Sequence, residues 1–215
     1  MATSGTTTFN LDVDEIIEEA YERCGLEATT GYDLKSARRC LNIMFAEWAN
    51  RGLNLWTIKQ KTMALTASTE SYQLDADIID VIDAVIKSGS VDYNIDKISR
   101  AEYLHIPNKT ATGRPSQYFL SRKDSPTIYL YNSPDKAYIF KYWAMTYVED
   151  VGNYSNQINV PKRFFPCMCS GLAYYLAIKK APERIQLLKP LYEEELQRAI
   201  QEDRERTSLK VKVGL

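Results

Sequence analysis

Apolar residues recur every three or four positions near the start of the chain, which is typical of a helix with one buried face. The apolar positions of residues 11–24 are Val13, Ile16, Ile17, Ala20, Tyr21 and Cys24. The opposite face is acidic, with Asp14, Glu15, Glu18, Glu19 and Glu22. Asp12 with Glu15 three residues later is typical of a helix start, and Gly25 of a helix end. A second helical stripe over 33–50, stopped by Gly52, completes a predicted antiparallel hairpin.

The middle of the chain has a different period. Apolar and polar residues alternate over 57–65, which is the period of a strand. Further strands are predicted over 71–74, 117–121, 127–131 and 137–147, with turn-forming residues between them. Over 78–86 the apolar spacing suits a helix, but the β-branched residues favour a strand. Ser99 and Glu102 predict the start of a short helix ending before Pro107. Residues 57–148 therefore predict an antiparallel β region.

The last third of the chain returns to a helical pattern. Residues 163–180 are apolar on nearly every face but too short and too interrupted to cross a bilayer. This segment is predicted to be the central buried helix of a bundle, with Gly171 allowing a neighbour to approach closely. Pro182 starts another helix, which Pro190 kinks or restarts, and its stripe continues to about residue 204.

Together these patterns predict an α+β fold, in which helices from both ends of the chain form a bundle and an antiparallel β-rich segment is inserted between them. The predicted domains are a mobile N-terminal segment (1–9), the bundle (10–56 with 159–206), the β-rich insertion (57–158) and a C-terminal tail (207–215). In the tail, Leu209, Val211 and Val213 alternate with Lys210 and Lys212. This pattern is too short to be stable as a strand alone, so the five residues are predicted to bind a partner.

The charge balance limits the possible functions. The chain has 27 Lys and Arg residues against 28 Asp and Glu residues, a net charge of −1. This excludes a polycation that coats DNA or an anionic membrane. The first residues lack the basic and apolar regions of a secretory signal. The sequence therefore predicts a soluble protein made inside the cell, without a membrane partner.

Few residues are candidates for catalysis or for metal binding. The four cysteines, Cys24, Cys40, Cys167 and Cys169, lack the paired spacing of a zinc site, and His105 is the single histidine. The cysteines are predicted to be small buried residues and His105 to lie at a surface or helix end. No phosphate loop, dinucleotide motif or nucleophile elbow occurs. Carboxylate pairs lie on predicted exposed helix faces, and most tyrosines alternate within strands. We expect no catalytic residue, no metal and no cofactor.

Several motifs, in order along the chain, resemble one family. They are E-W-A-N-R-G-L-N-L-W at 47–56, S-R-A-E-Y-L-H-I-P-N-K at 99–109, G-R-P-S-Q-Y at 113–118, V-P-x-R-F at 160–164, G-L-A-Y-Y-L-A at 171–177 and A-I-Q-E-D-R-E-R at 199–206. Together they resemble the head-to-tail adaptor (head completion or tail tubular) proteins of short-tailed bacteriophages. The similarity extends from about Leu11 to Ser208.

The resemblance implies a non-enzymatic structural connector of the virion, assembled in the host bacterial cytoplasm and placed at the head–tail junction. Members form a ring of about twelve copies between the portal and the tail nozzle or hub, and DNA passes through the lumen without sequence-specific binding. The resemblance also allows tail fibres as a further partner. Residues 209–213 lie beyond this similarity, and from their alternating pattern we expect them to contact the portal or a neighbouring subunit. Two alternatives remain open: a tail-associated cell-wall hydrolase using a carboxylate pair, and a nucleic-acid-binding module using tyrosines and basic residues.

Overall fold

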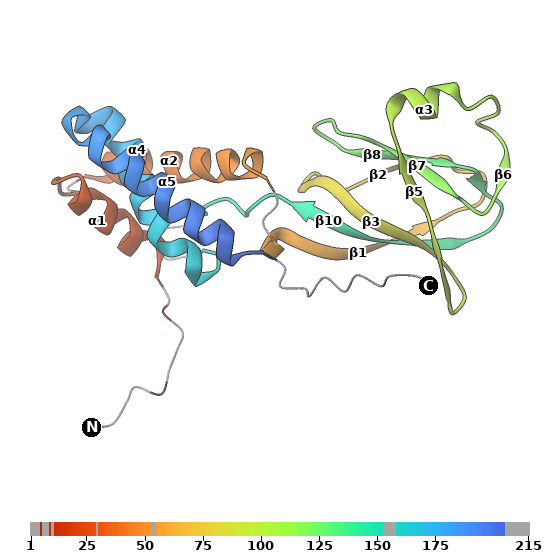
Figure 1. Cartoon of the computed structure of the whole chain (residues 1–215), viewed down its shortest axis with the longest axis horizontal. Helices are drawn as coiled ribbons and strands as arrows, with labels where there is room; N and C mark the ends of the chain where they lie inside the picture. Colours follow the sequence, from red (N-terminus) through yellow and green to blue (C-terminus); the bar gives the residue numbers. More distant parts are fainter. Residues whose placement is uncertain are drawn as a thin grey trace, which may run out of the picture. The chain divides into compact units, whose positions relative to one another are not determined.

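The chain folds into two units, each built from a different part of the sequence (Figure 1). A computed structural model describes residues 5, 9, 11–28, 30–52, 55–152 and 158–204. Unit 1 combines Met1–Trp56 with Val148–Leu215, and unit 2 is Thr57–Tyr147. The predicted tail, 207–215, and most of the predicted N-terminal segment, 1–9, lie outside the described residues. Mixed helix and sheet content confirms the α+β class.

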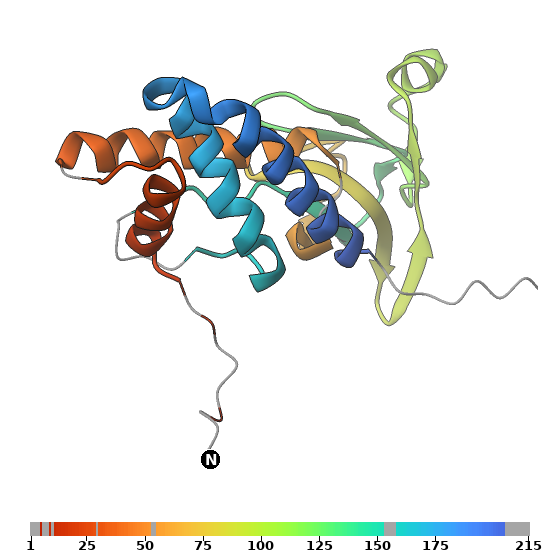
Figure 2. The ribbon, with the colours of Figure 1, turned by 60° about the vertical axis from the view of Figure 1, so that its left-hand side comes forward.

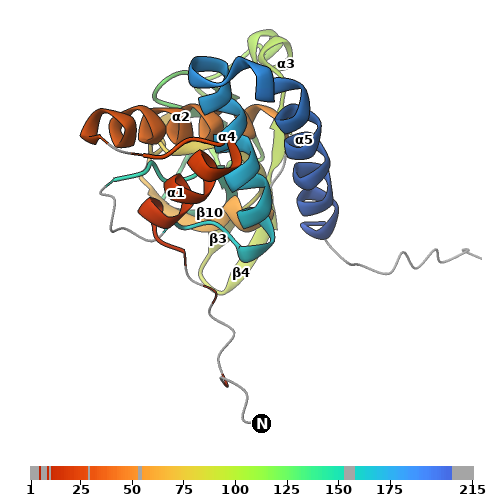
Figure 3. The same cartoon turned by 90° about the vertical axis from the view of Figure 1, so that its left-hand side faces the viewer.

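Unit 1 is helical. Its helices are α1 (Val13–Arg23), α2 (Gly31–Asn50), α4 (Phe165–Lys180) and α5 (Ile185–Glu202). The short 3-10 turns η2 (Lys162–Phe164) and η3 (Pro182–Arg184) precede α4 and α5. Helices α4 and α5 run side by side (Figure 2). Figure 3 shows α4 between α1 and α5, and α4 also contacts α2. The prediction that α4 is the central helix is confirmed, and α5 continues through Pro190 without a break.

The ends of α1 follow the predicted capping residues. The backbone N–H of Asp12 donates to the Glu15 carboxylate over 3.0 Å at the first turn. At the other end Gly25 has φ +69°, a left-handed conformation that favours glycine. The N–H of Gly25 donates to the carbonyl of Glu22 and that of Leu26 to the carbonyl of Tyr21. These two bonds form a Schellman motif, which satisfies carbonyls that the helix end leaves free.

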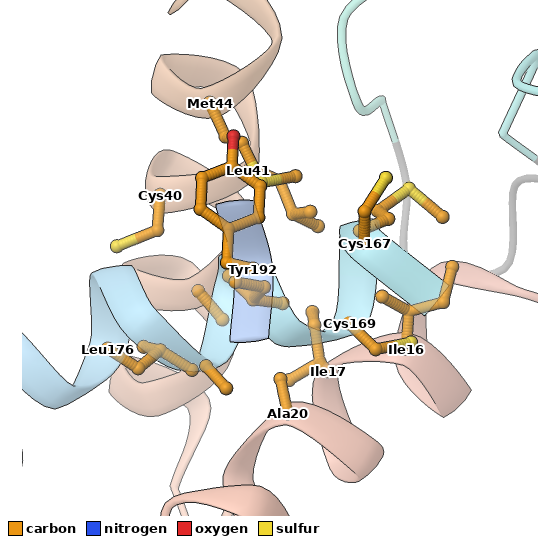
Figure 4. Close-up of a cluster of buried hydrophobic side chains, with 14 of the residues drawn as sticks. Ile16, Ile17, Ala20, Cys40, Leu41, Met44, Cys167, Cys169, Leu176 and Tyr192 are labelled. Atoms are coloured by element: carbon orange, nitrogen blue, oxygen red, sulfur yellow. The ribbon is translucent and has the colours of Figure 1, made fainter. Parts of the chain in front are cut away.

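The core of unit 1 is packed around α4 (Figure 4). Leu172 and Leu176 are fully buried there. A Cβ atom added to Gly171 would lie 2.6 Å from Met44 Sδ and 2.7 Å from Tyr192 Cε2, so α2 and α5 approach α4 more closely than any other residue would allow. The indole N–H of Trp48 donates to the Tyr192 hydroxyl over 2.9 Å, which satisfies both buried polar groups. The close approach predicted for Gly171 is confirmed.

Unit 2 contains ten strands within the described residues and one short helix, α3 (Arg100–His105). The strands are β1 (Ile58–Leu65), β2 (Ser71–Gln73), β3 (Ile78–Ser88), β4 (Val91–Asn94), β5 (Asp96–Ile98), β6 (Thr112–Gly113), β7 (Gln117–Ser121), β8 (Thr127–Tyr131), β9 (Ser133–Pro134) and β10 (Tyr138–Thr146). They form sheets with the orders β1-β10-β3-β4, β2-β8-β7-β5 and β6-β9. The predicted strand over 78–86 and the capped helix after Ser99 are confirmed.

The two four-stranded sheets share a core. Residues along β10 alternate, so that Phe140 and Tyr142 are buried whereas Ile139 and Trp143 on the opposite face are exposed. Across the core the ring of Tyr118 on β7 lies 5.6 Å from the ring of Phe140. Such pairs of inward-facing side chains hold two packed sheets together. The aromatic residues predicted to pack within strands therefore do so.

The prediction of an antiparallel β region is only partly correct. β5 pairs with β7 in parallel, and β6 pairs with β9 in parallel. The structure also contains β4 and β5, which the sequence pattern did not predict, because most of their residues are exposed and do not alternate. The boundary between the units lies at Tyr147 and Val148 rather than after residue 158, because Val151 packs into the core of unit 1.

Candidate functional site

The cysteines are structural. All four are free and buried, as predicted. The thiol of Cys24 donates to the carbonyl of Ala173 over 3.2 Å, and that of Cys167 to the carbonyl of Phe164 over 3.1 Å. Burial raises the pKa of Cys167 to about 12 and the pKa of Cys169 to about 11. Because the thiolate is the nucleophile and the metal ligand, these two residues are unreactive at neutral pH.

Metal ligands do not converge in the part of the chain that the structure describes. There, no three His, Cys, Asp or Glu residues are arranged to hold an ion. His105 is the exposed last residue of α3, at the helix end where the sequence placed it. In the same described regions, no helix combines the length and apolar character needed to span a bilayer.

The consecutive carboxylates Glu193, Glu194 and Glu195 point to three different arginines. The two carboxylate oxygens of Glu193 accept hydrogen bonds from Nη1 and Nη2 of Arg51, over 2.5 and 2.9 Å. This pairing lowers the pKa of the Glu193 carboxyl. Glu194 pairs with Arg198 on the same helix at 2.5 Å, and one oxygen of Glu195 lies 3.9 Å from Arg23. A glycosidase needs one carboxyl with a raised pKa opposite a second one. Glu193 therefore links α5 to the end of α2, and the three carboxylates do not face one another as an acid–base pair.

Three aromatic side chains of unit 2 form a cluster in which the rings pack against one another. The rings of Tyr103, Phe119 and Tyr129 lie 5.7 to 5.9 Å from one another. The guanidinium of Arg100 lies 5.8 Å from the Phe119 ring, and the ammonium of Lys109 lies 5.7 Å from the Tyr103 ring. These contacts fix α3 on the outer side of β7 and β8. Stacked rings with their own cations offer little free π-surface to a nucleic-acid base.

The helices of unit 1 expose charged residues to solvent. On α1 the acidic residues predicted to lie opposite the apolar stripe are exposed: Asp14, Glu15, Glu18, Glu19 and Glu22. Beside them is a groove of about 390 Å³ whose wall includes Leu11, Phe165 and Pro166. The candidate partner-binding residues of the tail, Leu209, Lys210, Val211, Lys212 and Val213, lie outside the described residues. Sequence reasoning missed this groove, because it joins α1 to a helix that starts far along the chain.

Glu193, the cysteines and the tyrosine cluster are engaged in structural contacts, and unit 1 exposes charged helix faces and an apolar groove. The family model of the SU10 adaptor protein matches residues 11–213, across both units. No curated protein matches the chain. The resemblance to phage head-to-tail adaptors is thereby confirmed along nearly the whole sequence. The chain belongs to the SU10 adaptor protein family, whose members are structural adaptors at the head–tail junction of bacteriophage virions.

Proposed function

We propose that this adaptor is the connector of a short-tailed phage, forming a ring of about twelve copies between the portal and the tail nozzle or hub. DNA passes through the lumen of the ring. The observation that carries the proposal is the family match over residues 11–213, which covers both units of the fold. Tail fibres are a further partner of such a ring.

The charge of the chain supports a passive DNA channel. A lumen lined by basic residues would bind phosphates and slow the passage of DNA. A net charge of −1 gives the chain no excess of positive charge to create this attraction. The four free, buried thiols also suit a protein assembled in the reducing cytoplasm of the bacterial host.

The C-terminal residues supply a contact to the portal or to a neighbouring copy. Leu209, Val211 and Val213 alternate with Lys210 and Lys212, as they would along a strand added to the edge of a sheet. Backbone hydrogen bonds then provide affinity, and the alternate side chains provide specificity. Neither rival function gains support, because Glu193 pairs with Arg51 and the tyrosine cluster is packed against its own residues.

Electron microscopy of the protein mixed with purified portal tests this function. The expected result is an additional ring on one end of the portal with a central channel, which then binds the nozzle protein. The absence of any portal complex, at concentrations at which the protein remains folded, would refute the connector role. Retardation of DNA at low salt, or turnover of cell-wall polymer, would favour one of the two alternatives.

A further inference from the structure

The solvent side of α2 carries a narrow ridge of apolar and basic residues. The ridge consists of Tyr32, Lys35, Arg39, Ile43 and Ala46, all exposed. Their spacing of three or four residues places them in one row along the helix. The side chains of Tyr32 and Ile43 are 69% and 52% exposed.

The two cations of this ridge lack an acidic partner among the residues of unit 1 that the structure describes. Among the described residues, Lys35 and Arg39 form no ion pair, and they lie four positions apart, where like charges repel along a helix. Arg51, the residue that follows α2, shows the contrast, because it is held by both Glu47 and Glu193. The ridge is therefore a surface whose charge a partner would neutralise.

The exposed face of α1 has the opposite charge. Glu18 and Glu22 are likewise four residues apart and without an ion pair in the described parts of the chain. At 1.5 Å per residue, both pairs span about 6 Å, so two helices can match them charge for charge. The groove next to Glu15 and Glu19 adds apolar surface at the side of this face. An amphipathic helix that docks into a groove uses this combination of apolar anchors and flanking charges.

We propose that the α2 ridge of one copy docks on the acidic α1 face and its groove on the next copy, an inference that rests on the ring proposed above. Lys35 and Arg39 meet the glutamates, and Tyr32 and Ile43 supply apolar side chains to the groove. Because the two surfaces are different and lie on the same unit, each copy can use both at once. A contact of this kind joins copies head to tail, which is the arrangement that closes into rings.

Charge reversal tests the contact directly. One variant makes both faces acidic (Lys35→Glu with Arg39→Glu), and the other makes both faces basic (Glu18→Lys with Glu22→Lys). The matched control, Lys87→Glu with Lys123→Glu, changes the net charge as the first variant does but alters exposed lysines of unit 2. Sedimentation equilibrium and native mass spectrometry at low ionic strength measure self-association. Thermal melts verify that each variant is folded.

The expected result is self-association of the unmodified protein that is weakened by salt and at least tenfold weaker in each single-face variant, but not in the control. An equimolar mixture of the two variants should regain association, and so should one chain carrying all four substitutions. Species larger than a dimer in the mixture indicate head-to-tail joining.

Three results would overturn the proposal: an unmodified protein that remains monomeric at low ionic strength at its highest soluble concentration, association that the reversals leave unchanged, and restored species that stop at the dimer. If the reversals instead abolish binding to portal rings while self-association is unchanged, the portal and not a second copy occupies the ridge. Self-association by this contact without any portal complex would leave the interface intact and remove the connector function.

Discussion

A single missing side chain sets the distance between helices at Gly171. Replacing Gly171 with Ala should destabilise the protein by about 1–3 kcal/mol, although alanine is the better helix former, because the new Cβ would lie within 3 Å of Met44 and Tyr192. The Tyr192 ring cannot move freely, since its hydroxyl holds Trp48. Denaturant titration measures the change in unfolding free energy.

Gly31 provides the control for this substitution. It is the first residue of α2, and a Cβ added there would meet no atom within 4 Å. Gly31→Ala should therefore leave the stability unchanged or raise it by up to about 1 kcal/mol. An equal loss of stability in both variants would show that packing at Gly171 is not the cause.

The ionisation of Asp33 should make the stability of the fold depend on pH in the acid range. Its carboxylate bonds to Lys180 and to Thr30, and these contacts lower its pKa to about 2. Because the folded pKa lies below the unfolded value of about 3.9, the contribution of Asp33 is complete above pH 4 and is lost as the pH falls toward 2. Melting temperatures of Asp33→Asn should be lower than those of the unmodified protein at pH 7, and the two should converge near pH 2. A constant gap between them over this range would rule out the assigned cause.

At the scale of elements, α4 should be the most sensitive helix. Leu176 is fully buried, and Leu176→Ala should cost about 2–5 kcal/mol. Among the described residues, Glu194 on the exposed side of α5 pairs only with Arg198 of its own helix, so Glu194→Ala should change stability by less than about 0.5 kcal/mol. Thermal unfolding followed by circular dichroism compares the two. Equally mild effects would contradict the central position of α4.

The helices and strands that could be predicted were those whose apolar residues recur with a regular period. The stripe of α1 and the alternation of β10 each reflect one buried face, so their pattern could be read from local sequence. β4 and β5 have no such face, and their strand state depends on pairing with β3 and β7. The parallel pairing of β5 with β7 also could not be predicted, because alternation does not identify the partner strand or its direction.

The surfaces of the candidate site were predictable only in part. The acidic face of α1 follows from sequence, since it lies opposite the apolar stripe. The groove beside it does not, because Phe165 and Pro166 reach α1 only through the tertiary fold. The pairing of Glu193 with Arg51 likewise joins residues far apart in the chain, which a search for adjacent carboxylates cannot detect.

At the scale of the whole molecule, the free protein should remain a monomer or small oligomer at physiological salt. Charged contacts between exposed helix faces are screened under these conditions, and such faces lack the apolar area of an obligate interface. Light scattering of the purified protein measures the size. A stable large ring in the absence of portal would contradict this expectation.

Residues 207–215 are predicted to bind a partner rather than to stabilise the fold. Deleting residues 207–215 should leave the melting temperature unchanged, because the described core residues of both units already form two well-packed clusters. It should weaken binding to portal rings, measured by co-sedimentation. A truncated protein that binds portal as tightly as the full chain would exclude the tail from assembly.

The hydrogen-bonded ends of unit 2 have a consequence for how such proteins diversify. Its first and last strands pair along their length, Ile58 opposite Met145, and the Thr146 hydroxyl donates to the carbonyl of Thr57 over 3.0 Å. The chain therefore enters and leaves this unit at neighbouring points. A segment with adjacent ends can be lengthened, replaced or exchanged between lineages without stretching the polypeptide that flanks it. Over evolutionary time the β unit can therefore change in length or sequence while the helices keep their packing.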